Sequence, residues 1–120
     1  VHALSYPLGG VHHVAHGESN QVMFAPVLQK YLEKHPTGKI NRLETLLSKL
    51  LGCAETAAIP ALYSLMDRVL PRRPMRGYGV TEDELPRYAD SVIETQQRLL
   101  GHNYVPLTRD EILAIYKCAY

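Results

Sequence analysis

The chain has 120 residues, which suits one domain or part of a larger one. Its 13 Lys and Arg residues nearly balance its 12 Asp and Glu residues, so its charge does not favour binding to nucleic acid or to a membrane surface. Apolar residues make up 46% of the chain, as in globular proteins, and no apolar run is long enough to span a bilayer. With no signal peptide either, we expect a cytoplasmic protein with no nucleic-acid or membrane partner.

The hydrophobic pattern is helical nearly throughout, and no stretch shows the alternation of a strand. A first helix is expected over 18–34, with either a kink or a shifted first turn at Pro26, and a second helix over 40–51. A third is expected over 54–70, where Pro71 ends it. The Pro- and Gly-rich segment that follows, RRPMRGYGV, is expected to be a loop.

Two capping boxes mark the starts of the last two helices. Thr81 and Glu84 predict a helix that runs to about Leu100, and Thr108 and Glu111 predict a final helix to the end of the chain. The sequence therefore predicts an all-α fold, a bundle of about five helices joined by short loops.

The first twenty residues, VHALSYPLGGVHHVAHGESN, hold four of the six histidines: His2, His12, His13 and His16. Neutral imidazole is a common metal ligand, and the residues PLGG at 7–10 predict a turn that would bring His2 and His16 together. The alternative is that each histidine lies at the surface with its own local hydrogen bonds. Glu18 is the only carboxylate nearby, so any further metal ligands would come from elsewhere.

The string His2-Ala-Leu-Ser-Tyr6-Pro-Leu-Gly-Gly, followed by His13-Val-Ala-His16-Gly and then Asn20, resembles the iron-containing (group III) alcohol dehydrogenases. The signature of that family reads approximately H-x-x-x-H-P-L-G, then P-H-G and an Asn. The diagnostic motif covers about the first twenty residues, and the helical remainder resembles the tail of the family's helical domain.

This resemblance implies a two-domain enzyme. An N-terminal α/β domain would bind NAD(P), and a C-terminal helical domain would hold Fe²⁺ or Zn²⁺ through an Asp and three His residues. His2 and His16 match the last two of these ligands. Residues 1–120 would then be the C-terminal portion of the metal-binding domain, while the nucleotide-binding domain and the other two ligands lie outside this chain. The implied reaction is reversible oxidation of a primary alcohol to the aldehyde, by a homo-oligomer.

Two positions depart from the family pattern. Tyr6 stands where many members have a second His proposed to assist proton transfer, and Ala15 replaces the Pro before the last ligand. Tyr6 is therefore the candidate catalytic residue, although a tyrosine hydroxyl is a weaker base than imidazole at neutral pH. The Tyr variant of the motif is most similar to the 4-hydroxybutyrate dehydrogenases within the family, which makes 4-hydroxybutyrate the implied substrate.

The sequence also predicts the roles of several other side chains. Ser19 and Asn20 are candidate partners for the ligand imidazoles, His12 is expected to be exposed, and His13 lines the cleft or has a structural role. Cys53 and Cys118 are expected to be packed, reduced thiols. Three arginines in the loop are candidates to receive a substrate carboxylate: Arg72, Arg73 and Arg76.

The sequence also allows a function other than that of an enzyme. The chain could be a stand-alone helical interaction module whose histidines bind metal only incidentally.

Overall fold

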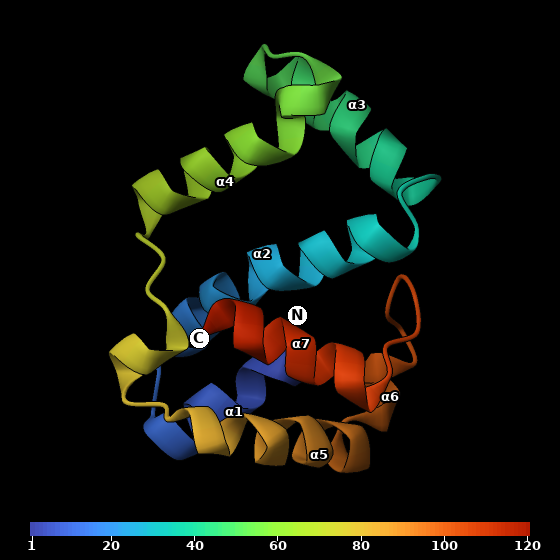
Figure 1. Ribbon diagram of the computed structural model, residues 1–120. Coiled ribbons are helices and arrows are strands. Elements are labelled where there is room, and N and C mark those ends of the chain that lie inside the picture. The colour runs from blue at the N-terminus through green and yellow to red at the C-terminus, as the bar shows by residue number, and fades with distance from the viewer.

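The computed structural model describes all 120 residues, and it is helical throughout (Figure 1). Seven α-helices follow one another along the chain: α1 (His2–His12), α2 (His16–Lys34), α3 (Lys39–Leu51), α4 (Ala58–Val69), α5 (Leu85–Thr95), α6 (Gln97–Leu100) and α7 (Arg109–Ala119). Three single 3-10 turns connect them, at Glu55–Ala57, Met75–Tyr78 and Glu82–Glu84. The expected all-α class is confirmed, with more helices than expected.

Four of the helices, α1, α2, α5 and α7, form a body around one hydrophobic core of 17 buried residues. Figure 1 shows α7 in the middle of the body, beside α2 on one side and α5 on the other. Tyr116 of α7 is fully buried, and its hydroxyl donates a hydrogen bond of 2.9 Å to the carbonyl of Leu4 in α1. The first and last helices are thereby joined inside the core.

The other two long helices form an arm, defined here as residues Lys39–Val69, which stands off the body as a V above α2 (Figure 1). The arm contributes three buried residues, Ile40, Ala58 and Ile59, to the 26 in the chain. Ile40 and Ile59 form a small second cluster with Leu28 of α2. The radius of gyration, 14.6 Å, exceeds the value of about 13.6 Å typical of a compact domain of this length, in line with an arm that projects.

The main errors of the sequence prediction lie in α1 and at the break between α5 and α6. Residues 7–10 do not form the expected turn, because Pro7 and both glycines lie inside α1. The chain reverses at 13–15 instead, where His13 adopts a left-handed backbone with φ 54°. The helix expected from Thr81 to Leu100 is interrupted at Gln96, which separates α5 from α6.

The central predictions hold. Residues 18–34 are helical and continue through Pro26, and the helices expected over 40–51 and 54–70 are α3 and the 3-10 turn with α4. Both capping boxes are present, at Thr81 with Glu84 and at Thr108 with Glu111.

None of the helices combines the length and apolar character needed to cross a membrane. Taken together, Lys39–Leu51 and Glu55–Val69 are long and apolar enough to cross a membrane by length and composition only, but the two segments are bent by 93° at their junction.

Candidate metal centre

The two predicted ligands, His2 and His16, lie side by side although 14 positions separate them. His2 is the first residue of α1 and His16 is the first residue of α2. Their ring centroids are 5.2 Å apart and the ring planes are inclined by 36°. Both side chains are exposed, so the pair opens onto the surface of the body.

This separation fits two imidazoles bound to one ion. With metal–nitrogen bonds of about 2.1 Å and a tetrahedral angle, the centroids of two ligand rings lie about 5 Å apart. No third His, Cys, Asp or Glu lies close enough to complete a site within this chain. The chain therefore provides two ligands of a site that needs further ligands from outside it.

The connection between α1 and α2 produces the pair. After α1 ends, residues 13–15 run back along that helix, and the Val14 amide donates to the carbonyl of Leu8 at 3.3 Å. Val14 is itself buried against the core. Ser19 then stabilises the start of α2, because its hydroxyl donates to the carbonyls of Val14 and Ala15. Ser19 thus supports the backbone around His16, and no hydrogen bond joins it to either imidazole.

Asn20 is the partner of His16 that the sequence analysis named. The side-chain nitrogen Nδ2 of Asn20 lies 2.9 Å from Nε2 of His16. His16 precedes Asn20 by one helical turn, so both lie on the same face of α2. A ligand histidine binds the metal through one ring nitrogen and donates the N–H of the other to an acceptor, so Asn20 would support His16 with its amide oxygen turned toward Nε2, which leaves Nδ1 for the metal. Asn20 also carries a buried Oδ1 with no partner, as expected of a site that atoms outside this chain complete.

Tyr6 lies one turn after His2 on α1, with its ring centroid 6.4 Å from that of His16. Its side chain is 44% exposed. Tyr6 also lines a groove of about 520 Å³ between α1 and α5, together with Pro7, Val11, Tyr88 and other residues. Tyr6 therefore neighbours both the histidine pair and this groove.

His12 is not exposed as expected but half-buried, and its Nε2 lies 3.1 Å from Oε1 of Glu84. Glu84 also accepts hydrogen bonds from the Thr81 amide and the Tyr88 hydroxyl. The Thr81 amide above all, with His12 and Tyr88, lowers the pKa of Glu84 from 4.5 to about 2. This cluster joins the end of α1 to the start of α5, and it does not include His2 or His16.

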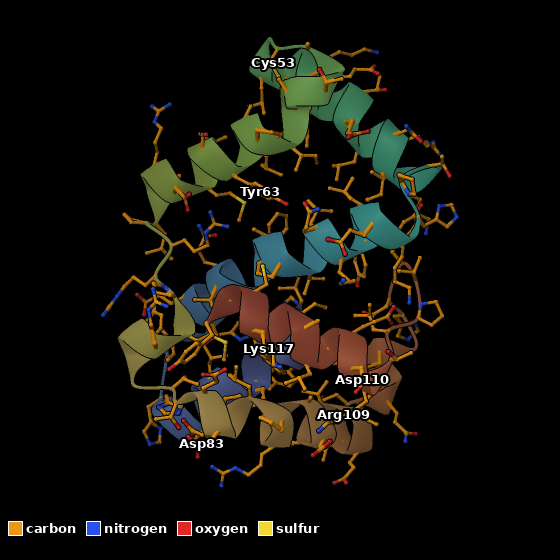
Figure 2. All side chains as sticks on the ribbon, viewed as in Figure 1. Cys53, Tyr63, Asp83, Arg109, Asp110 and Lys117 are labelled. Carbon is orange, nitrogen blue, oxygen red and sulfur yellow. The ribbon has the colours of Figure 1, made fainter.

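His13 is exposed and lies at the C-terminus of α1, where its left-handed backbone starts the reversal of the chain; whether it lines the cleft stays a prediction. The expectation of packed thiols is wrong for Cys118, which is exposed, while Cys53 is half-buried at the tip of the arm (Figure 2). Both cysteines are free, as predicted.

The loop arginines do not line the groove beside Tyr6. Arg72 pairs with Asp67 at 3.3 Å, and Arg73 donates to the carbonyl of Gly77 and lies over the ring of Tyr78. Arg72 and Arg73 line a different hollow, between α2 and α4.

Comparisons with known proteins identify relatives of the chain. The family model described as "Fe-containing alcohol dehydrogenase family, C-terminal" matches residues 1–120. The chain is 49% identical over 120 residues to 4-hydroxybutyrate dehydrogenase of Clostridium kluyveri, of which it covers 32%. It is 33% identical over 125 residues to long-chain-alcohol dehydrogenase 1 of Geobacillus thermodenitrificans, covering 31% of that protein.

A more distant relative is alcohol dehydrogenase 4 of Schizosaccharomyces pombe, 31% identical over 122 residues, of which the chain covers 28%. In each comparison the match includes at least 99% of this chain. The chain thus spans about a third of the length of the curated relatives it matches. No solved structure gives a significant match.

Proposed function

The chain belongs to the Fe-containing alcohol dehydrogenase family, and from this premise we propose that it is the C-terminal, metal-binding part of an NAD(P)-dependent enzyme that oxidises a primary alcohol to the aldehyde. The observation that carries the proposal is the His2–His16 pair, whose rings lie 5.2 Å apart at the motif shared with the family. An isolated helical module with incidental histidines gives no reason for this spacing.

In the proposed enzyme, His2 and His16 would hold a divalent cation, either Fe²⁺ or Zn²⁺, together with ligands from outside this chain. Such a cation supplies Lewis-acid polarisation of the alcohol oxygen. Asn20 holds the ring of His16 in place through the contact at Nε2. The remaining ligands and most of the NAD(P) site belong to the N-terminal part of the polypeptide, which this chain does not contain.

Tyr6 is placed to handle the proton of the alcohol. Its side chain is exposed, and its ring neighbours that of His16. For alcohol oxidation, the Tyr6 oxygen would accept the proton of the alcohol hydroxyl while the proton of Tyr6 itself passes to solvent.

The proposed substrate is 4-hydroxybutyrate, on the strength of the 49% identity to a 4-hydroxybutyrate dehydrogenase over the whole chain. We further propose a homo-oligomeric cytoplasmic enzyme, which stays a prediction.

The test uses the full-length enzyme loaded with Fe²⁺ or Zn²⁺, with NAD⁺ or NADP⁺ as oxidant and 4-hydroxybutyrate or 1-butanol as substrate. We expect reduction of the cofactor by the wild type, loss of turnover in His16→Ala, and a reduced rate with unchanged metal content in Tyr6→Phe. His13→Asn is the matched control, because His13 is three residues from His16 and Asn tolerates its left-handed backbone. Full turnover in His16→Ala, or no alcohol oxidation by the wild type, would contradict the proposal.

A further inference from the structure

The groove between α1 and α5, which Tyr6 lines, has walls that are mostly small, apolar or uncharged. Its volume of about 520 Å³ is in the range of sites that bind small molecules. Only two charged side chains line it, Glu84 just before α5 and Arg87 in the first turn of α5. A substrate that extends from the histidine pair into this groove would therefore meet one anion and one cation.

The anion, Glu84, is already held by other groups of the protein. Its Oε1 accepts a hydrogen bond of 3.0 Å from the Tyr88 hydroxyl and lies 3.1 Å from Nε2 of His12. Its Oε2 accepts from the amide and the hydroxyl of Thr81 at 2.7 Å and 3.1 Å. Both carboxylate oxygens therefore serve the contact between α1 and α5.

The cation, Arg87, has no comparable partner. Its nearest carboxylate belongs to Asp83, where Oδ2 lies 3.7 Å from Nη2 of Arg87, too far for a hydrogen bond. The two side chains are 81% and 72% exposed, and an exposed ion pair of this kind is weak. The guanidinium of Arg87 is therefore free to bind a carboxylate that enters the groove.

Arg87 also lies at a suitable distance along the groove from Tyr6. α1 and α5 both line the groove and meet at His12 and Glu84, so they run in opposite directions along it. At a rise of about 1.5 Å per residue, Tyr6 lies about 9 Å back from His12, and Arg87 lies about 4.5 Å on from Glu84. The two residues are thus offset by about 4–5 Å along the groove. An extended four-carbon hydroxy acid spans about 6 Å between its hydroxyl and carboxylate oxygens, at about 1.2 Å per bond.

We propose that Arg87 binds the carboxylate of an ω-hydroxy acid whose alcohol group lies at Tyr6 and the histidine pair, and that it thereby sets a preference for such acids over neutral alcohols. The planar guanidinium suits this role, since it can donate two parallel hydrogen bonds to one carboxylate. The inference rests on the proposed function, which places the alcohol at the histidine pair. It also replaces the expectation from the sequence, because none of the three loop arginines lines the groove.

The test compares 4-hydroxybutyrate with 1-butanol, which has the same carbon chain without the carboxylate, as substrates of the full-length enzyme. In Arg87→Met, the ratio of the two kcat/KM values should fall by about 10- to 100-fold, mainly through a higher KM for 4-hydroxybutyrate, because hydrogen bonds to a charged group are lost. Arg87→Lys should lose less, since it keeps the charge but not the paired donors. Isothermal titration calorimetry without NAD(P) should show 4-hydroxybutyrate binding weakened by a similar factor in Arg87→Met.

Two control variants separate this role from a general effect of surface charge. Arg68→Met is the matched control, because Arg68 is an exposed arginine of α4 that does not line the groove, and it should keep the wild-type preference. Asp83→Asn removes the ion-pair partner of Arg87 and should keep or raise the preference for 4-hydroxybutyrate. A fall in Asp83→Asn as large as that in Arg87→Met would assign the effect to the ion pair and overturn the proposal.

An unchanged ratio of kcat/KM values in Arg87→Met would also overturn the proposal, as would an equal loss with both substrates. Where 1-butanol is oxidised too slowly to measure, the calorimetric affinity for 4-hydroxybutyrate decides, and an unchanged affinity in Arg87→Met contradicts the proposal. An enzyme that oxidises neither substrate would refute the proposed function. In that case, weaker binding of 4-hydroxybutyrate to Arg87→Met would still support Arg87 as the carboxylate site.

Discussion

The body and the arm are made of similar amphipathic helices, but only the body closes around a core. In the body, Leu4, Leu8, Ile112 and Tyr116 are essentially inaccessible to solvent. In the arm, Leu50 and Val69 are mostly exposed. Amphipathic spacing therefore determines which face of a helix is apolar, while the partners available in space determine whether that face is covered. The histidine pair lies on the body, whose hydrophobic core is closed.

The largest stability difference between the two regions is expected for core truncation. Leu8→Ala, in the body, should lower the free energy of unfolding of this chain by about 2–5 kcal/mol, because it leaves a cavity among fully buried side chains. Leu50→Ala, in the arm, should change it by less than about 0.5 kcal/mol, because the side chain is already exposed. Urea unfolding measures both, and equal losses would erase the distinction between the regions.

The next largest effect is a loss of stability in acid, which we expect from protonation of Glu84 in the body. The pKa of Glu84 is about 2 in the folded protein and 4.5 ordinarily, so the carboxylate stabilises the fold above pH 4.5. That contribution, about 1.5–3 kcal/mol for hydrogen bonds to a charged group, is lost as the pH falls through the interval between these two values.

Unfolding measured from pH 6 to pH 2 in Glu84→Gln should therefore show a flatter acid limb than the wild type. Glu44→Gln, on α3 of the arm, is the matched control and should keep the wild-type slope. An unchanged slope in Glu84→Gln would show that the cluster between α1 and α5 does not stabilise the body.

A smaller effect is expected at the start of α7. The Thr108 hydroxyl accepts a hydrogen bond of 3.2 Å from the Glu111 amide, and Glu111 also pairs with Lys34 of α2 at 2.7 Å. Thr108→Ala should lower the free energy of unfolding by about 1 kcal/mol through loss of the N-cap. Thr95→Ala, at the exposed end of α5, should cost less, and a larger loss there would show that the cap is not what stabilises α7.

Local patterns in the sequence predicted most of the helices but not α1. Pro7, Gly9 and Gly10 disfavour a helix by propensity, yet burial of Leu4 and Leu8 against the other helices outweighs that preference. The proximity of His2 and His16 was predicted correctly for the wrong reason, because the reversal occurs at 13–15. His13, the residue that makes it, has no turn signal of the kind that Gly or Pro gives.

Other features could not be predicted because they depend on contacts between distant residues. His12 meets Glu84 across 72 positions, and no local pattern indicates that pairing. The break at Gln96 lacks Gly or Pro and arises where the chain turns from α5 to α6. Asn20, by contrast, could be identified beforehand, since its spacing of four from His16 places both on one face of a helix.

The metal content of the full-length enzyme tests the central claim most directly. After dialysis against a graded chelator series, elemental analysis should show that His2→Ala and His16→Ala each weaken metal binding by more than about 100-fold, because losing a ligand costs more than losing its supporting partner. His13→Asn should bind metal like the wild type. Wild-type affinity in either His2→Ala or His16→Ala would show that these two imidazoles are not half of a metal site.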